Sequence, residues 1–170
     1  MITIEQIDAP TPMDLWDLMD RHNLLSVALR ANPGIVANMC GTGKFWIWHE
    51  DGNPLALQME FRLGDPEVID LMLVPEDRWL GKRREEVAEL AGGLRERWFG
   101  PGGARRVQAA IPASRVNLHR ITKSLGFIEE TRHDVGLRGG VRLGKKSEGL
   151  VLYGLLPHDP IKVYGEPASA

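Results

Sequence analysis

The feature that most constrains the fold of this chain is the stretch from Glu67 to Phe99. It starts with the apolar run Val68–Val74, passes through a proline and an acidic pair into a turn with Arg78 and Gly81, and ends in a long amphipathic segment. This order predicts a strand, a turn and a helix. The first N–H groups of a helix lack backbone partners and carry partial positive charge, so such a turn can seat an anion. The alternative is an ordinary strand–helix turn with basic residues on a solvated face.

Length, charge and cysteine usage narrow the class of protein. A chain of 170 residues is most simply one domain, and it can bury a substantial core. Its formal net charge of −2 provides no strong field that would favour nucleic acid or an anionic membrane. Cys40 is the single cysteine, which excludes an intramolecular disulfide and a zinc cluster, and we expect it to be a packed side chain.

The N-terminus does not resemble a signal peptide, because no basic stretch precedes an apolar one. No apolar run approaches the length of a membrane span. We therefore expect a cytoplasmic protein that does not enter a membrane. Residues 1–157 are expected to form one domain, and the Pro-rich residues 158–170 to form an extended or loosely docked tail.

Signals for one strand and two helices precede the central region. Ile2–Ile7 predicts a short opening strand, and the pairs Thr11-Pro12 and Asn32-Pro33 each predict a helix start with proline in the first turn. The second of these helices is expected to end near Gly41. The segment Leu24–Arg30 fits a strand or a helix equally well.

The clearest hairpin comes next. Lys44–His49 is aromatic and β-prone, Asp51–Asn53 is a turn, and Leu55–Leu63 resumes as a strand. With Val68–Val74, three consecutive strands therefore lead into the anion turn. Trp46 and Trp48 share one face of their strand, either as a wall of an acceptor pocket or as packing in the core or at a homodimer interface.

The central helix has apolar residues at a three-and-four spacing that predicts one buried face: Val87, Leu90, Ala91, Leu94 and Trp98. Gly92-Gly93 within it either permits close packing against the sheet or forms a weak spot. A second apolar strand, Arg106–Ile111, is broken by Pro112, and Ser114 is expected to cap the following helix.

Gly126 is expected to end that helix in the left-handed conformation. Two more strands are expected near Ile128–Val135 and Gly149–Leu156, joined by the Gly- and Arg-rich residues 136–147. The full order is then strand, two helices, three strands, helix, strand, helix and two strands.

Two local patterns resemble the GNAT acyltransferase superfamily. The family's central turn has the pattern Gln/Arg-x-x-Gly-x-Gly/Ala, and here Arg78 and Gly81 fit it after the typical Leu-x-Leu-Val-Pro-Glu of residues 71–76. Arg83 replaces the last small residue, where it either obstructs a pyrophosphate or supplies a cation to it. The second pattern is the strand, break and helix of residues 107–127, which end in Leu125-Gly126-Phe127 as in many members.

The resemblance implies an α/β (α+β) fold with a mixed, mostly antiparallel central sheet that is flanked by helices and splayed between its fourth and fifth strands. It also implies acetyl-CoA, or another acyl-CoA, as cosubstrate, with the pantetheine arm in the splay. The implied contacts to the arm are main-chain groups of Met72, Leu73 and Val74. The implied pyrophosphate contacts are Arg78, Trp79, Leu80, Gly81, Lys82 and Arg83, and Trp79 could cover the cofactor or a partner. Asn117 lies near the helix start where members often have a cofactor-binding asparagine.

The resemblance also implies direct attack by an amine, which needs a base and a proton donor. Alignment places Glu67 where some members have a glutamate base. Asp70 is a second candidate, inside an apolar strand but on the opposite face from Glu67. Glu60 is a third carboxylate, expected on a solvated face or in contact with the acceptor. Thr122 stands near the position of the family's acidic tyrosine, and a threonine hydroxyl is a poor acid.

The resemblance therefore implies an N-acyltransferase, most simply an acetyltransferase, acting on a small-molecule or macromolecular amine. One alternative is a non-catalytic GNAT-like binding module, which Arg83 and the absent tyrosine favour. Another is transfer to a nucleic-acid-bound amine through the basic loop Arg138–Lys146, for which a solvated hairpin loop is the favoured interpretation. The histidines His49, His119 and His133 lack ligand spacing, so no metal site is expected.

Overall fold

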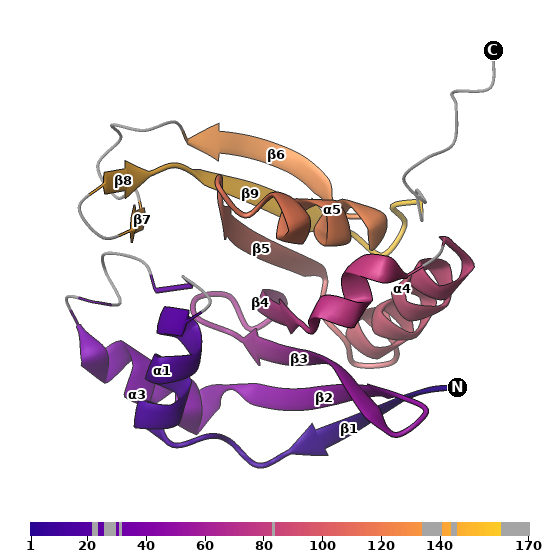
Figure 1. Cartoon of the computed structure of the whole chain (residues 1–170), viewed down its shortest axis with the longest axis horizontal. Coiled ribbons are helices and arrows are strands. Elements are labelled where there is room, and N and C mark those ends of the chain that lie inside the picture. Colours follow the sequence, from indigo (N-terminus) through magenta and orange to yellow (C-terminus); the bar gives the residue numbers. More distant parts are fainter. Residues whose placement is uncertain are drawn as a thin grey trace.

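The computed structural model describes residues 1–21, 24–25, 30, 32–82, 84–133, 141–143 and 146–160. A seven-stranded sheet with the order β1-β2-β3-β4-β5-β9-β6 forms its centre, and a small hairpin of β7 and β8 lies apart from it (Figure 1). The strands are β1 (Ile2–Ile7), β2 (Lys44–Glu50), β3 (Asn53–Phe61), β4 (Val68–Pro75), β5 (Arg106–Pro112), β6 (Ile128–His133), β7 (Val141–Leu143), β8 (Lys146–Glu148) and β9 (Leu150–Leu155). The helices are α1 (Pro12–Arg21), α3 (Pro33–Thr42), the 3-10 turn η1 (Asp77–Gly81), α4 (Arg84–Phe99) and α5 (Val116–Ser124).

Neighbouring strands of the large sheet run antiparallel except β4 and β5, which are parallel. These two strands pair only from Val68–Asp70 to Arg106–Gln108 and then separate. The predicted mixed, mostly antiparallel sheet with a splay between its fourth and fifth strands is therefore confirmed.

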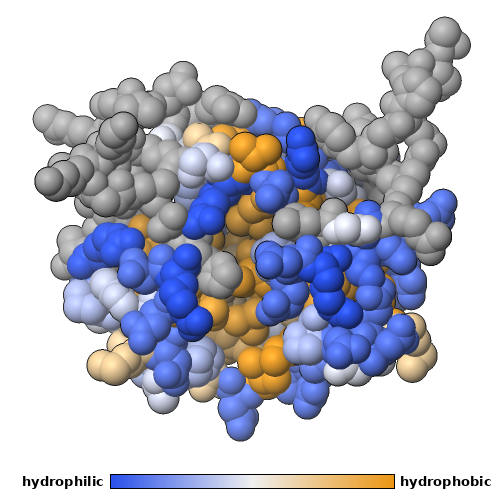
Figure 2. All heavy atoms as spheres, viewed as in Figure 1, coloured by the Kyte–Doolittle hydropathy of each residue, from blue (hydrophilic) through white to orange (hydrophobic). Residues whose placement is uncertain are grey.

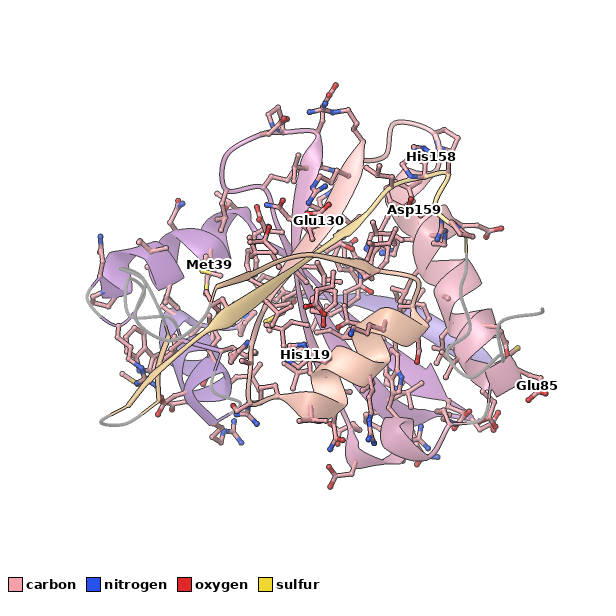
Figure 3. All side chains as sticks on the ribbon, turned by 90° about the horizontal axis from the view of Figure 1, so that it is seen from above. Met39, Glu85, His119, Glu130, His158 and Asp159 are labelled. Carbon is pink, nitrogen blue, oxygen red and sulfur yellow. The ribbon has the colours of Figure 1, made fainter. Side chains whose placement is uncertain are left out.

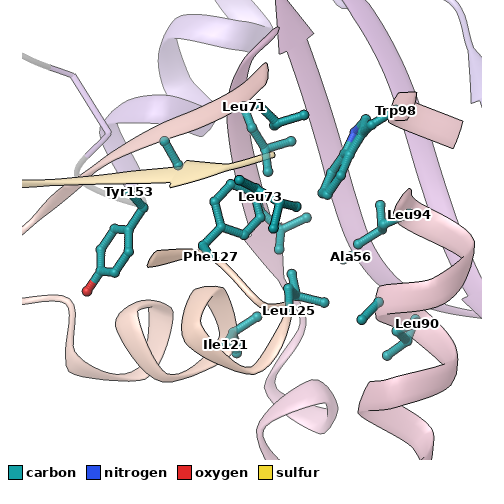
Figure 4. Close-up of a cluster of buried hydrophobic side chains, with 14 of the residues drawn as sticks. Ala56, Leu71, Leu73, Leu90, Leu94, Trp98, Ile121, Leu125, Phe127 and Tyr153 are labelled. Atoms are coloured by element: carbon teal, nitrogen blue, oxygen red, sulfur yellow. The ribbon is translucent and has the colours of Figure 1, made fainter. Parts of the chain in front are cut away.

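Helices cover both faces of the sheet. Side chains alternate along each strand, so both faces carry apolar side chains that pack against helices. On β4, Leu71 and Leu73 point into a core with α4 and α5, whereas Met72 and Val74 point into a second core with α1 and α3. Figure 4 shows the first core, where Trp98 and Leu94 of α4 approach Phe127 and Leu73. All five residues of the predicted apolar face of α4 are buried, which confirms that prediction.

The β2–β3 hairpin is confirmed, and its turn explains its register. Asp51 and Gly52 both have positive φ, 49° and 79°, as the two central residues of a tight turn that matches the twist of antiparallel strands. Asn53 already belongs to β3 rather than to the turn. At the first helix, the Asp14 N–H donates to Thr11 Oγ1 (3.2 Å), so the predicted cap is confirmed.

The start of α5 differs from the prediction. The helix begins at Val116, its N-cap is Arg115, and Ser114 does not serve as the capping residue. Pro112 and Ser114 supply carbonyls to the N–H groups of Arg115 and Val116, so the chain makes a tight turn before the helix can start. At the other end Gly126 has φ +93°, which confirms the predicted left-handed residue.

Gly92 and Gly93 of α4 are not required by close packing. A Cβ on Gly92 would meet nothing within 4 Å, and one on Gly93 would lie 3.7 Å from Trp48 Cη2, an ordinary contact. This contradicts the interpretation that the two glycines permit close packing, and the weak spot in the helix stays a prediction. Each glycine costs about 1 kcal/mol relative to alanine in a helix interior.

The start of the predicted tail is attached to α4. Arg95 donates hydrogen bonds to the carbonyls of Leu156, Pro157 and Asp159, and the Asp159 carboxylate accepts the Leu156 N–H. Residues 161–170, most of the segment Leu24–Arg30 and residues 134–140 lie outside the described residues. No helix in the described part of the chain combines the length and apolar character that crossing a membrane requires.

Candidate cofactor and active site

The separation of β4 from β5 creates a hollow of about 300 Å³ at the carboxyl ends of the two strands. One wall is the end of β4 with the residues that follow it, and the other is the first turn of α5. Its lining residues are Leu24, Leu73, Val74, Pro75, Asp77, Ser114, Arg115, Val116, Asn117 and Leu118. Figure 2 shows hydrophobic surface in the middle of the face seen in Figure 1, between hydrophilic residues on either side.

Two smaller hollows share lining residues with this one. The inner hollow, about 20 Å³, lies between the diverging strands and is lined by Leu24, Leu71, Met72, Leu73, Ala109, Ala110, Ile111, Leu118, Thr122, Leu125 and Phe127. The outer hollow, about 120 Å³, lies between the start of α4 and α5 and is lined by Trp79, Lys82, Val87, Asn117, Arg120, Ile121 and Ser124. Leu73 is shared by the inner and main hollows, and Asn117 by the main and outer ones. The predicted site residues that line these neighbouring hollows are Met72, Leu73, Val74, Trp79, Lys82, Asn117 and Thr122.

His119 holds the first turns of α5 to the neighbouring chain through two hydrogen bonds. His119 Nε2 lies 3.0 Å from the Pro112 carbonyl, which can only accept, so this nitrogen carries the proton. Nδ1 is then the acceptor for the Tyr153 hydroxyl at 2.9 Å. Leu118, Thr122 and Leu125, at a spacing of four and three residues, share the face of α5 that lines the inner hollow.

The side chain of Arg78 is bonded to the chain itself. Its guanidinium donates to the carbonyls of Pro54 (2.8 Å) and Asn53 (2.7 Å) and lies 3.7 Å from the Glu50 carboxylate. Lys82, whose side chain is 9 % exposed, forms an ion pair with the same Glu50 carboxylate. These two cations of the predicted pyrophosphate turn therefore fasten η1 to the β2–β3 hairpin.

The backbone of the turn is also partly occupied. The N–H groups of Trp79 and Lys82 donate to the carbonyls of Glu76 (2.9 Å) and Trp79 (3.0 Å), because residues 77–81 form a 3-10 turn. Arg83 lies outside the described residues, as does the side chain of Leu80. The described part of the turn is thus more closed than the predicted open anion seat.

Trp79 differs from its neighbours in having an unsatisfied donor. The side chain is 2 % exposed, and its indole N–H has no hydrogen-bond partner among the described residues. Trp79 lines the outer hollow together with Asn117 and Arg120, both of which are exposed. A buried indole N–H usually has an acceptor, so Trp79 is a candidate hydrogen-bond donor to a ligand in the outer hollow.

The three candidate carboxylates lie in different environments. Glu67 is exposed at the start of β4, where it pairs with Arg105 at 3.2 Å, and it does not line the hollows. Asp70 belongs to the last paired row before the strands separate and accepts a hydrogen bond from Gln108 at 2.7 Å. Asp70 does not line the three hollows either, but Met72, two residues further along the same strand, lines the inner one.

Glu60 is not on a solvated face, contrary to the first of its two predicted placements. It is 9 % exposed under α4, where Trp98 Nε1 donates to Oε1 at 2.7 Å and the Gln58 amide donates to the same atom. Burial raises the pKa of this carboxyl, and the hydrogen bonds and the charge of Arg97 only partly oppose that effect. Glu60 does not line the three hollows.

Trp46 and Trp48 are buried side chains that line none of the three hollows. Both are 3 % exposed; Trp48 donates to Gln58 at 2.7 Å, and the Arg97 guanidinium lies 3.6 Å from the Trp46 ring centroid. Most of the basic loop Arg138–Lys146 lies outside the described residues. No group of three or more side chains suited to a metal ion was found in the described part of the chain.

Sequence reasoning missed four polar residues of this region: Arg115, Arg120, Gln108 and Glu130. Arg115 lines the main hollow, and its Nε is buried without a partner in the described structure. The signal for Arg115 and Arg120 was the helix start itself, where two arginines flank Asn117. Gln108 and Glu130 carried no local signal, because their partners are distant in sequence.

Comparison with known proteins identifies the fold. No family model and no curated protein matches this chain. Among solved structures, it is similar to an IAA acetyltransferase from Bacillus cereus (12 % identity, TM-score 0.56, covering 92 % of this chain and 99 % of the other) and to the spermidine/spermine N-acetyltransferase of Vibrio cholerae (10 %, 0.59, 92 % and 92 %). It is also similar to a ribosomal-protein-S5-alanine acetyltransferase from Vibrio fischeri (12 %, 0.56, 93 % and 94 %). These likenesses over almost the whole chain, together with the splay between β4 and β5, show that it has the fold of the GNAT acetyltransferases.

Proposed function

We propose that this protein is an N-acyltransferase that transfers an acyl group, most simply acetyl, from an acyl-CoA to an amine. The observation that carries the proposal is the opening between β4 and β5, together with three neighbouring hollows along β4 and α5 that share lining residues. The names of the structurally similar proteins support acyl transfer to amines in general, while the acceptor of this chain is a separate question.

The main hollow suits the uncharged arm of an acyl-CoA. Leu73, Val74 and Leu118 give it apolar walls, and the strand edge at residues 72–74 provides main-chain groups along one side. The polar side chains of Asp77, Ser114, Arg115 and Asn117 complete its lining, and a concave site that combines apolar walls with a few polar groups is typical of small-molecule binding. Met72, Leu73 and Val74 are therefore the residues that we assign to the arm.

The outer hollow suits the phosphates and sugar at the other end. The indole N–H of Trp79, the Arg120 guanidinium and the Asn117 amide are hydrogen-bond donors, and the lining contains no Asp or Glu. Arginine forms strong, charge-assisted hydrogen bonds with phosphate oxygens. Arg120 and Trp79 would thus hold the anionic end, in place of the occupied side chains of Arg78 and Lys82.

The inner hollow suits the reacting end. When bound, the donor supplies an acyl thioester, from which the acyl group passes to the amine nitrogen as the thiol leaves. The small volume of about 20 Å³ favours a short acyl group. Thr122, 4 % exposed, carries the hydroxyl group of this lining, and we assign it to hydrogen-bond the departing sulfur.

The test compares acetyl-CoA binding and turnover between the wild-type protein and a variant in which a large side chain fills the inner hollow. We expect acetyl-CoA to raise the melting temperature of the protein and to release free thiol when an amine is added from a broad panel. Ala110 is an exposed residue that lines the inner hollow. The variant Ala110→Trp should abolish both effects, because the larger side chain fills this hollow. Met13→Trp is the matched control, because Met13 is 74 % exposed on α1 and does not line the hollows.

Retention of acetyl-CoA binding by Ala110→Trp, with an unchanged circular dichroism spectrum, would contradict the proposed binding mode. Absence of thiol release with every amine, despite tight binding by the wild-type protein, would contradict catalysis.

A non-catalytic binding module is the second candidate. It is favoured by the ion pairs that engage Arg78 and Lys82, and by a threonine where the family has a tyrosine. Under this alternative, calorimetry would show acyl-CoA binding without turnover.

A further inference from the structure

A line of hydrogen bonds crosses the sheet at the closed end of the opening. Gln108 Nε2 donates to Asp70 Oδ1 (2.7 Å), Arg106 Nε donates to Gln108 Oε1 (3.3 Å), and both terminal nitrogens of Arg106 donate to the Glu130 carboxylate. The other Asp70 oxygen accepts the Leu63 N–H at 3.3 Å. The line joins β4, β5 and β6, although β9 separates β5 from β6.

Gly154 of β9 is what allows this line to cross the intervening strand. A Cβ at this position would lie 2.7 Å from Glu130 Cδ and 2.8 Å from Arg106 Nη2, so a side chain would displace the ion pair. Tyr153, the preceding residue, points to the opposite face and meets His119. Figure 3 shows the labelled Glu130 and His119 on opposite sides of the β9 ribbon.

Asp70 stands where the opening begins. Asp70 and Gln108 form the last row of the β4–β5 pairing, and beyond them the strands diverge. Two residues further along β4, on the same face, Met72 lines the inner hollow. Asp70 is partly exposed, and a carboxylate with about four lone-pair positions can accept further donors besides Gln108 and Leu63.

Arg106 decides how the Gln108 amide is oriented. Arginine can only donate, so it binds the amide oxygen and turns the amide nitrogen toward Asp70. Glu130 in turn holds the Arg106 guanidinium through two hydrogen bonds, which limits its rotation. The three residues therefore fix the position of one carboxylate.

We propose that Asp70 binds the acceptor amine and takes up its proton, and that Gln108 and Arg106 position Asp70 for this task. The inference rests on the proposed acyl transfer. An acceptor ammonium group donates to the Asp70 carboxylate, one N–H bond breaks, the proton moves to the carboxylate oxygen, and the nitrogen keeps the electron pair with which it attacks. The substrate class is a primary amine that arrives as a cation, because an ionised carboxylate attracts it.

Two single variants test the role of Asp70. Asp70→Asn should lower kcat at least about 100-fold, the lower range for loss of a general base, and leave the KM for acetyl-CoA unchanged. Asp65→Asn is the matched control, because Asp65 also accepts a backbone N–H (2.8 Å) and pairs with Arg105, but precedes β4. Asp65→Asn should retain wild-type kcat.

A charge-swapped double variant tests the positioning role separately from stability. Arg106→Glu with Glu130→Arg retains an ion pair over Gly154, but the carboxylate at residue 106 attracts the Gln108 amide nitrogen and turns the oxygen toward Asp70. We expect an unchanged melting temperature and a roughly tenfold lower kcat/KM for the amine, with the KM for acetyl-CoA unchanged. Gln108→Leu should match this loss, and Gln108→Glu should exceed it through repulsion between like charges.

The inference is overturned if Asp70→Asn retains wild-type kcat, or if Glu67→Gln shows the large loss instead. It is also overturned if the swapped variant is fully active. An amine-binding measurement separates this outcome from failure of the proposed function. Methylamine should shift the carboxyl NMR signal of Asp70 but not that of Asp65. If that shift occurs while no acyl donor is turned over, the proposed function fails and amine binding by Asp70 stands.

Discussion

The two sides of the η1 turn differ in what their polar groups are bonded to. On the side of the β2–β3 hairpin, Arg78 and Lys82 are engaged by carbonyls and by Glu50. On the side of α5, the Trp79 indole N–H has no hydrogen-bond partner among the described residues, and the exposed Arg120 lines the outer hollow. The difference teaches that a basic residue at a motif position is available to a ligand only where no other group of the chain already binds its side chain.

The largest expected effect comes from removing the contacts between η1 and the β2–β3 hairpin. Arg78→Ala removes charge-assisted hydrogen bonds to the carbonyls of Asn53 and Pro54, and it should lower the free energy of unfolding by about 2 kcal/mol. Urea denaturation measures the change. Affinity for acetyl-CoA, measured well below the unfolding midpoint, should remain within about twofold, and a tenfold loss would place Arg78 on the ligand after all.

A smaller effect is expected from removing a cation on the side of α5. Arg120→Gln should weaken acetyl-CoA binding about tenfold, or about 1.4 kcal/mol, through loss of a phosphate contact. Titration calorimetry gives the dissociation constant, and the affinity for acetyl-pantetheine, which lacks the nucleotide, should not change. Arg105→Gln is the control, since Arg105 is exposed and pairs with Asp65 and Glu67 away from the hollows. Equal losses for both donors would argue against a phosphate contact.

A third change tests the comparison by releasing Lys82 from the hairpin side of the turn, so that it can act on the side of α5. Glu50→Gln removes the carboxylate that holds Lys82, and Lys82 also lines the outer hollow. The released ammonium should strengthen acetyl-CoA binding roughly threefold, about 0.6 kcal/mol, and this gain should shrink at high salt. Weaker binding would show that the ion pair is needed to shape the hollow.

The smallest expected effect is a difference in pH dependence between two carboxylates of the sheet. The Arg106 guanidinium lowers the pKa of Glu130, so its contribution to stability is present above the unfolded pKa of about 4.5 and is lost as pH falls through the folded value. Burial raises the pKa of Glu60, so its contribution is present below about 4.5 and is lost as pH rises through the folded value.

Thermal melts of Glu130→Gln and Glu60→Gln between pH 3 and 7 check these opposite slopes. The stability difference between wild type and Glu130→Gln should vanish toward low pH. Glu60→Gln should gain on wild type as pH rises, and parallel curves for both variants would contradict the assignment.

Local patterns were sufficient to predict most of the fold. The turn at Asp51-Gly52, the Thr11 cap, the apolar face of α4 and the left-handed Gly126 each follow from residues close in sequence. The start of α5 was misplaced because Pro112 and Ser114 form a tight turn through carbonyls, which side-chain capping preference does not reveal.

The candidate site was predicted less completely because its decisive contacts are distant in sequence. Glu50 lies 32 residues from Lys82, and Gln108 lies 38 residues from Asp70. A motif can indicate that Arg78 belongs near a ligand, but it cannot show that a hairpin carbonyl binds this side chain first. Likewise, Glu60 looked solvated because its partner, the indole N–H of Trp98, comes from helix α4, 38 residues away in sequence.

The short β4–β5 pairing has a consequence for the sheet as a whole. Only three rows, from Val68 to Asp70, join the half made of β1 to β4 to the half made of β5, β9 and β6. Residues 71–75 and 109–112 thereby form two facing edges inside a single sheet, each with a row of backbone groups that the other strand does not satisfy. A bound molecule that bridges these edges would join the two halves of the sheet. Amide hydrogen exchange along both edges should therefore slow together when it binds.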